Sequence, residues 1–305
     1  MKEPAQGGTA IGLLVSDVDG TLVTDKKTMT ARTKAAVASL RANNIAFAII
    51  SSRPPRGLRM LIERLEITTL VAGFNGGVLT NPDLSIVTQH ILSPAAARQA
   101  VDMINAHGAQ AWVFCGQDWL VRDPKCPYVG LEEHTIGFRS TVVGDFGRAL
   151  DNAAKIVGVS ENFELLSRLE HDARTKLDDR ATVTRSQSYY VDITHPLANK
   201  GIALSTVANL LAVQMTEVVV IGDGGNDVAM FERSGLSIAM GNASPEVQRA
   251  ADFVTDSNNQ DGFAKAVERF VLGGNHSNAI ASDPAAGSSQ PSRGHTTSRR
   301  KAYRR

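Results

Sequence analysis

Two aspartates, placed two positions apart directly after a short apolar run, constrain this sequence more than any other feature. The run is residues 11–16 (IGLLVS), of the kind that forms a buried strand, and it leads into residues 17–21 (DVDGT). While the chain stays extended, Asp17 and Asp19 point to the same side, and Gly20 then permits a sharp turn. Open α/β sheets bind ligands at the carboxyl ends of their strands. The segment therefore predicts a pair of acids at such an edge, although alone it also fits a solvated turn.

Strand and helix signals alternate from residue 11 to residue 73. Strands are expected where apolar residues form an unbroken run, as in a parallel sheet covered on both faces. Helices are expected where apolar residues recur on one face and where proline can open the first turn. The expected strands are residues 45–50 and 70–73, and the expected helices are residues 30–43 and 54–65. Repetition of strand, helix and strand implies right-handed crossovers and a doubly wound parallel sheet.

The pattern changes at about residue 82 and stays different up to residue 195. Here the chain is more polar, and its strand and helix signals no longer alternate strictly. The expected helices are residues 95–107 and 148–157, and the expected strands are residues 111–114, 119–122, 181–186 and 189–193, the last two as a hairpin. This mixture predicts an antiparallel α+β unit that is inserted into the first domain.

The first pattern returns after Lys200. The expected helices are residues 201–211, 227–234, 245–251 and 262–272, and the expected strands are residues 217–221, 236–240 and 253–254. The expected fold is therefore α/β, with a discontinuous core domain of residues 1–81 and 196–272 and an inserted domain of residues 82–195. Residues 273–305 lack periodicity, hold six basic residues and one acid, and are expected to be a disordered basic tail.

The charge and cysteine content of the chain exclude several classes of partner and location. Lysine plus arginine number 32 and aspartate plus glutamate number 31, so we expect no membrane partner and no specific nucleic-acid partner. The basic tail could bind nucleic acid or a membrane weakly, but a solvated end is preferred. Two cysteines give no disulfide framework, and no segment has the apolar length of a signal peptide or a membrane span. A reduced cytoplasm is the expected location, and the oligomeric state stays open.

Polar residues of four segments fall where an expected strand ends or an expected helix begins. They are Asp17 and Asp19, Ser51, Lys200, and residues 222–227 (GDGGND) with Asp223, Asn226 and Asp227. The carboxyl ends of neighbouring parallel strands meet in one crevice, so these side chains are expected to converge. Taken singly, each has an ordinary explanation as a turn acid, a helix cap, a surface lysine or a dinucleotide loop. The last explanation is disfavoured because residues 222–227 lack the G-x-G-x-x-G spacing.

Four carboxylates, one hydroxyl and one ammonium in a single crevice are the parts that phosphoryl transfer needs. A carboxylate nucleophile can accept the phosphoryl group and so divide hydrolysis into two easier steps. A lysine and a magnesium ion can neutralise the charge of the transferring group, and Mg²⁺ prefers oxygen ligands. A second acid can protonate the leaving alcohol and later activate water.

Together the motifs resemble those of the haloacid dehalogenase-like (HAD) superfamily, and within it the Cof-type sugar-phosphate phosphatases with a large inserted cap. The resemblance covers residues 11 to 272. The matching motifs are residues 17–21 (DVDGT), 49–51 (IIS), 75–77 (NGG), 199–201 (NKG) and 222–227 (GDGGND) with the following Met230. One departure is Ser52, because the family usually has a glycine there whose backbone can adopt unusual dihedral angles.

The resemblance implies roles for the acidic residues. Asp17 is the expected nucleophile that forms an aspartyl-phosphate, and Asp19 is the expected general acid/base. Mg²⁺ is the expected cofactor. Its expected ligands are Asp17, Asp19 through its backbone carbonyl, Asp223 and Asp227.

The resemblance also implies roles for the remaining motif residues. Ser51 and Lys200 are expected to hold the phosphate, and Asn226, Asn75 and Gly76 are expected to bind phosphate or substrate. Residues 82–195 are the expected cap, which closes over the crevice and selects the leaving group.

The sequence therefore predicts a magnesium-dependent phosphatase that acts on a small phosphorylated metabolite, with a sugar phosphate as the preferred class. A phosphomutase or phosphotransferase that uses the same aspartyl-phosphate stays open, because the core motifs are common to both. A phosphometabolite sensor that has lost turnover is a third alternative, and the four intact motifs argue against it.

Overall fold

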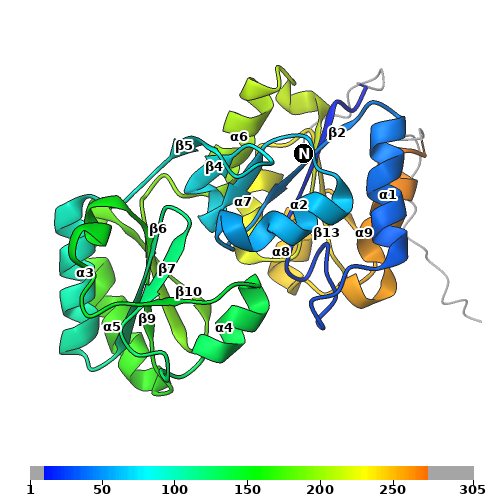
Figure 1. Cartoon of the computed structure of the whole chain (residues 1–305). Coiled ribbons are helices and arrows are strands. Elements are labelled where there is room, and N and C mark those ends of the chain that lie inside the picture. The colour runs from blue at the N-terminus through cyan, green and yellow to red at the C-terminus, as the bar shows by residue number, and fades with distance from the viewer. Residues whose placement is uncertain (1–9, 274–305) are drawn as a thin grey trace, which may run out of the picture. The chain divides into compact units, whose positions relative to one another are not determined.

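The computed structural model describes residues 10–273 of the chain, and its first β-sheet has eight strands (Figure 1). The strand order is β14-β13-β12-β1-β2-β3-β4-β5. The strands are β1 (Leu13–Ser16), β2 (Ala46–Ile50), β3 (Val71–Gly73), β4 (Val78–Thr80), β5 (Ile86–Gln89), β12 (Val218–Gly222), β13 (Leu236–Ala239) and β14 (Phe253–Val254). From β14 to β3 neighbouring strands are parallel, whereas β4 and β5 are added antiparallel at one edge. The predicted parallel sheet is confirmed.

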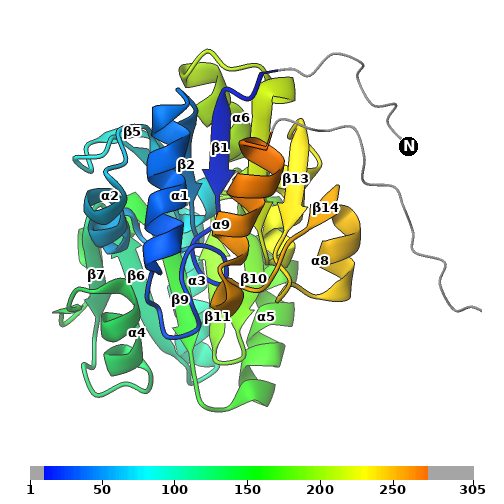
Figure 2. The ribbon, with the colours of Figure 1, turned by 90° about the vertical axis from the view of Figure 1, so that its right-hand side faces the viewer.

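Helices cover both faces of this sheet. One face carries α1 (Ala31–Ala42), α2 (Arg59–Leu65) and α9 (Gly262–Ala266), and the other carries α6 (Lys200–Leu210), α7 (Val228–Phe231) and α8 (Pro245–Ala250). Alternate residues of β1 serve the two layers, because Leu14 packs in the first and both Leu13 and Val15 pack in the second. Figure 2 shows α1 beside α9 over the sheet. The doubly wound architecture is therefore confirmed.

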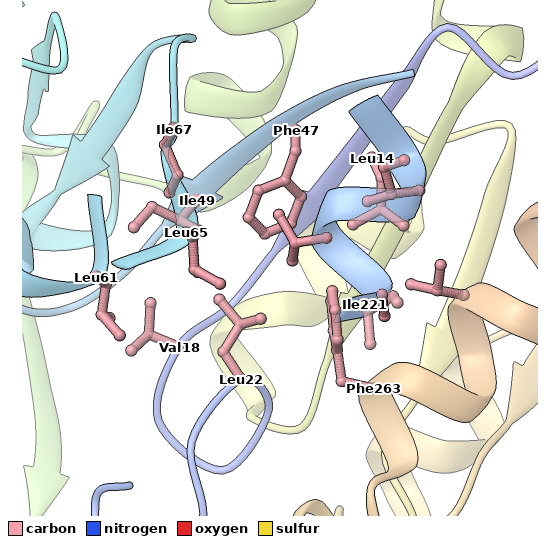
Figure 3. Packing of buried hydrophobic residues seen from close by; sticks show 14 of the residues in the cluster. Leu14, Val18, Leu22, Phe47, Ile49, Leu61, Leu65, Ile67, Ile221 and Phe263 are labelled. Atoms are coloured by element: carbon pink, nitrogen blue, oxygen red, sulfur yellow. The ribbon is translucent and has the colours of Figure 1, made fainter. Parts of the chain in front are cut away.

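Figure 3 shows the first of these layers from close by, with Leu14, Phe47 and Phe263 pointing toward one another. The rings of Phe47 on β2 and Phe263 on α9 meet edge to face, with centroids 6.0 Å apart. Val18 and Leu22 extend the same cluster beyond the end of β1. This packing anchors the turn that carries Asp17 and Asp19.

A second sheet has six strands in the order β10-β11-β9-β6-β7-β8. The strands are β6 (Gln110–Cys115), β7 (Asp118–Val121), β8 (Thr141–Val142), β9 (Ala153–Val159), β10 (Thr182–Gln187) and β11 (Tyr190–Thr194). All neighbours are antiparallel except β7 and β8. Helices α3 (Pro94–Ala106) and α5 (Phe163–Leu177) lie side by side on one face, and α4 (Val129–Ile136) packs with the other. The inserted segment is thus an antiparallel α+β unit.

The chain leaves the first sheet later than the sequence suggests. The predicted boundary between residues 81 and 82 falls inside this sheet, because β5 follows it and pairs with β4. The chain enters the second sheet only after His90 and leaves it before His195, and these two rings stack with centroids 5.4 Å apart. The predicted tail, residues 273–305, lies outside the described residues except for Gly273.

The predicted helix at residues 148–157 is wrong. Residues 147–152 form a 3₁₀-helix, and the chain then becomes β9. The apolar spacing of Leu150, Ala153 and Ile156 suggested a helix, but β9 lies between β6 and β11 and is buried on both faces. A central strand with continuous apolar sequence has no alternation that would distinguish it from a buried helix. The sequence interpretation also omitted α4, α5, β4, β5 and β8.

Helix α5 was omitted although the sequence contains a signal for it, a capping residue followed by apolar residues at helical spacing. Asn162 accepts the backbone N–H of Leu165 at 3.0 Å, as an N-cap should. Leu166, Leu169 and Ala173 then follow at helical spacing and are fully buried.

Across residues 10–273, the helices are all too short or too polar to span a bilayer.

Candidate active site

The carboxyl ends of β1 and β12 bring three aspartates together. Asp17 directly follows β1, Asp223 directly follows β12, and Asp227 lies four residues further on. One carboxylate oxygen from each of these residues lies within 4.8 Å of the others. The convergence expected at this edge of the sheet is therefore present for these three acids.

Lys200 joins two of these acids from below the surface. Its Nζ donates to Asp17 Oδ1 and to Asp227 Oδ1, each at 2.6 Å. Lys200 is 1% exposed and Asp227 is fully buried. Burial alone lowers the pKa of Lys200, but the charges of Asp17 and Asp227 raise it further than burial lowers it, so the ammonium stays charged. Asn199 positions this lysine, because its Oδ1 accepts from Gly201 N and Ile202 N and begins α6 at Lys200.

Asp227 also shapes the loop that carries Asp223. Its Oδ2 accepts the backbone N–H groups of Asp223 and Gly224, at 2.9 and 2.8 Å. Gly222 is required nearby, because a Cβ there would lie 2.5 Å from Asp227 Cγ. Asp227 thus has a structural role at both of its oxygens.

Asp223 is held by two groups from neighbouring loops. Thr21 Oγ1 donates to Asp223 Oδ1 at 3.0 Å, and Asn242 Nδ2 donates to Asp223 Oδ2 at 3.1 Å. Gly20, with φ +84°, lets the first loop approach closely, because a Cβ there would lie 2.1 Å from Asp223 Oδ2. These contacts fix the carboxylate of Asp223 beside that of Asp17.

The donor set of this cluster fits a magnesium ion. Burial and the neighbouring carboxylate of Asp227 raise the pKa of Asp223 to about 6. Burial raises the pKa of Asp17, and the charges of Asp227 and Asp223 add to this against the opposing charge of Lys200. Three carboxylates and one ammonium leave an excess of negative charge, and oxygen donors of this kind are those that Mg²⁺ takes.

The carboxylate of Asp19 lies outside this cluster and is paired with two cations. Arg53 donates from Nε to Oδ2 at 2.7 Å and from Nη2 to Oδ1 at 2.6 Å, and Lys27 Nζ donates to Oδ1 at 2.8 Å. Burial raises the pKa of Asp19, but the hydrogen bonds and charge of Arg53, together with Lys27, outweigh it and lower the pKa to about 2. Asp19 is therefore ionised in this arrangement.

Ser51 and Ser52 occupy different positions. Ser51 is 1% exposed, and its Oγ accepts from Arg53 N at 3.1 Å. Ser52, which stands where the family usually has glycine, lines the cavity described below, and its backbone does not adopt a positive φ. The side chain at this position therefore needs no strained backbone.

Asn75, Gly76 and Asn226 belong to two loops that meet. Asn226 Nδ2 donates to Asn75 Oδ1 at 2.9 Å, and Asn75 has a left-handed backbone with φ 57°. Gly76, with φ +96°, packs closely on α6, because a Cβ there would lie 2.4 Å from the Cβ of Ala203. Asn75 and Asn226 line the cavity, whereas Gly76 supports the loop from behind.

A cavity of about 860 Å³ opens above the acidic cluster. Asp17, Asp19 and Asp223 line it on the side of the first sheet, and Glu132, Lys155 and residues of β10 and β11 line it on the side of the second. The space is sufficient for a small organic phosphate.

The sequence interpretation gave no role to four residues that complete the site: Thr21, Lys27, Arg53 and Asn242. Asn242 could have been found by the rule that located Asp17 and Asp223, because it follows shortly after the end of β13. Lys27 and Arg53 could not, because their relation to Asp19 depends on how separate loops fold together.

Comparison with known proteins gives a consistent assignment. The model of the haloacid dehalogenase-like hydrolase family matches residues 14–267. A protein of Haemophilus influenzae is 28% identical over 254 residues, which cover 83% of this chain and 95% of that protein. A Bacillus subtilis protein named 5-amino-6-(5-phospho-D-ribitylamino)uracil phosphatase is 26% identical over 264 residues, covering 86% and 96%.

Solved structures agree. The crystal structure of a haloacid dehalogenase-like hydrolase from Bacteroides thetaiotaomicron is 27% identical with a TM-score of 0.79, covering 85% of this chain and 99% of that one. A Thermotoga maritima structure shares the fold, with a TM-score of 0.77, 22% identity, and coverage of 85% and 97%. The chain therefore belongs to the haloacid dehalogenase-like hydrolase family, in the Cof-type branch that its motifs predict.

Proposed function

We propose that the protein is a magnesium-dependent phosphatase that hydrolyses a small phosphorylated metabolite through a phosphorylated Asp17. The observation that carries this proposal is the position of Asp17, whose carboxylate lies in the acidic cluster, is held by Lys200, and lines the cavity. Phosphatase names among relatives of 28% and 26% identity support it.

In the first half-reaction, an oxygen of Asp17 attacks phosphorus and the bond from phosphorus to the leaving oxygen breaks. The leaving oxygen takes a proton from the carboxyl group of Asp19 and departs as an alcohol. Lys200 orients the carboxylate of Asp17, opposes the effect of burial on its pKa, and adds positive charge beside the phosphoryl oxygens.

In the second half-reaction, water attacks phosphorus and gives its proton to the carboxylate of Asp19, and the bond to Asp17 breaks. The ionised Asp19 of this structure suits this step, since its carboxylate is free of a proton and held by Arg53 and Lys27. For Asp19 to act first as an acid, its contacts with these two cations must loosen when substrate enters.

Asp17, Asp223 and Asp227 would hold Mg²⁺, with Asp19 contributing its backbone carbonyl. When bound, the ion supplies positive charge that balances the carboxylates and the phosphoryl group.

The residues of the first sheet would form the core domain, and residues between His90 and His195 would form the cap.

A sugar phosphate is the proposed class of substrate, because a cavity of about 860 Å³ with both charged and aromatic walls suits a polar organic phosphate. We propose the cytoplasm as the site of action, since Cys115 and Cys126 are both free thiols.

Phosphate release from a panel of sugar phosphates, nucleotides, flavin phosphate and pyridoxal phosphate tests the proposal. We expect release that requires Mg²⁺, is lost with a chelator, and is abolished in a folded Asp17→Asn variant. Absence of release from every compound by a folded, magnesium-binding protein would favour a mutase or a sensor. A fully active Asp17→Asn variant would exclude the aspartyl-phosphate.

A further inference from the structure

The second sheet turns an aromatic face away from α3 and α5. Trp112, Phe114, Trp119 and Tyr190 cluster on it, and Phe74 from the turn after β3 joins them. Among these rings lie charged groups that have no part in the proposed chemistry of Asp17. They are Lys155 on β9, Asp192 on β11 and Glu132 on α4.

Lys155 and Asp192 form an almost buried ion pair. Their Nζ and Oδ1 are 2.9 Å apart, and their side chains are 13% and 6% exposed. Strand register explains the pairing, because Lys155 lies opposite Thr194, and Asp192 lies two residues before Thr194 and so on the same face of β11. Removing two charges from water is costly, and apolar residues of the same size would pack as well on this aromatic face. The pair is therefore poorly explained by stability alone.

One carboxylate oxygen of Glu132 accepts a hydrogen bond, and the other is available to a ligand. Tyr190 OH donates to its Oε2 at 3.2 Å. Within the part of the chain that the structure describes, Tyr190 is the one hydrogen-bond donor to Glu132, and Oε1 of Glu132 accepts none. Burial raises the pKa of Glu132, which Lys155 and Tyr190 oppose, so the carboxyl group would gain from further hydrogen-bond donors.

Both Glu132 and Lys155 line the cavity that the acidic cluster also lines. The charge of Lys155 is already balanced by Asp192, and the free oxygen of Glu132 accepts rather than donates. The other cap cation in the lining is Arg185, whose guanidinium donates to Ser167 Oγ and to the carbonyl of Ser188. This wall thus offers an acceptor and a donor that line the same cavity, with little excess charge.

We propose that Glu132 and Lys155 select the leaving group by hydrogen-bonding neighbouring hydroxyls of a neutral polyol, which donates to Glu132 and accepts from Lys155. Tyr190 is a positioning residue that orients Glu132 through its hydroxyl. The inference rests on the proposed phosphatase function and adds to it the class of leaving group and the residues that recognise it.

The test compares kcat/KM for the best substrate in a panel of aldose and alditol monophosphates with kcat/KM for phenyl phosphate, which has no hydroxyl on its leaving group. In Glu132→Gln, we expect the ratio of the two values to fall about 10- to 100-fold, as for loss of a hydrogen bond to a charged acceptor. In Tyr190→Phe, a smaller fall of about 2- to 5-fold is expected. Adding Tyr190→Phe to Glu132→Gln should change the ratio little further, because the two act through one carboxylate.

Glu164→Gln is the matched control. Glu164 lies on α5, its side chain is 83% exposed, and it takes no part in the cavity lining, so the ratio should stay that of the wild type. A wild-type protein that hydrolyses phosphate esters but prefers phenyl phosphate would overturn the inference. So would a ratio unchanged within about 2-fold in both Glu132→Gln and Tyr190→Phe. If the wild type releases phosphate from neither compound, the proposed function itself has failed.

Discussion

Arg53 donates hydrogen bonds to both carboxylate oxygens of Asp19, from Nε to Oδ2 at 2.7 Å and from Nη2 to Oδ1 at 2.6 Å. Its side chain is only 7% exposed. This fork-to-fork geometry is the strong form of an arginine–carboxylate pair. It places the predicted general acid/base in its ionised form and ties it to the loop after β2. The proton-carrying form of Asp19 therefore requires this pair to open during each catalytic cycle.

Replacing Asp19 should change how stability depends on pH. The pKa of Asp19 is lowered from 3.8 to about 2, so its stabilising contribution is present above pH 4 and is lost as pH falls toward 2. A shift of this size corresponds to about 2 kcal/mol. Urea unfolding at several pH values should show that Asp19→Asn loses about that much of the wild-type pH dependence in this window. Equal pH dependence in the two proteins would contradict the ion pair.

Replacing Lys200 should destabilise the protein strongly. In Lys200→Met, Asp17 and Asp227 stay buried without their shared cation, and the free energy of unfolding should drop by about 3–5 kcal/mol. Lys265→Met is the control, since Lys265 pairs with Asp256 at the surface with side chains 39% and 50% exposed. It should cost less than about 1 kcal/mol. Similar losses in both variants, measured by chemical denaturation, would refute a special role for Lys200.

Replacing Gly20 should weaken metal binding. A Cβ at Gly20 would lie 2.1 Å from Asp223 Oδ2, so Gly20→Ala must displace the carboxylate that Thr21 and Asn242 hold. Loss of such support costs about 10- to 100-fold in metal affinity. Gly116→Ala is the control for backbone strain. Gly116 also has a positive φ, but a Cβ there would have no atom within 4 Å, so this variant introduces the strain without displacing a carboxylate. Titration with Mg²⁺ should show weaker binding in Gly20→Ala alone.

The order of motifs was sufficient to predict the doubly wound sheet and the meeting of Asp17, Asp223 and Asp227. Asp17 and Asp223 each directly follow a strand whose apolar run is plain in the sequence, and Asp227 ends the loop that Asp223 begins. Because the two strands are parallel neighbours, their carboxyl ends bring the three acids together. The bond from Lys200 to both Asp17 and Asp227 adds a detail that spacing alone does not contain.

The parts that were not predicted depend on tertiary packing. β9 has the apolar spacing of a helix, and only its place between β6 and β11 makes it a strand. The pairing of Asp19 with Lys27 and Arg53 joins three loop positions whose side-chain directions no sequence pattern records. The sequence likewise does not reveal that Glu132 and Lys155 line one cavity, because Glu132 lies on α4 and Lys155 lies on β9.

The most direct test of the account is a search for phosphate on Asp17. With an aryl phosphate, whose leaving group needs little protonation, Asp19→Asn should slow the second half-reaction more than the first, so that acid quenching during turnover traps the phosphorylated protein for peptide mapping by mass spectrometry. We predict one phosphoryl group on Asp17 in Asp19→Asn, and none in the double variant that also carries Asp17→Asn. Phosphate release by the wild type together with an unmodified Asp17, or with the phosphoryl group on another residue, would contradict the proposed mechanism.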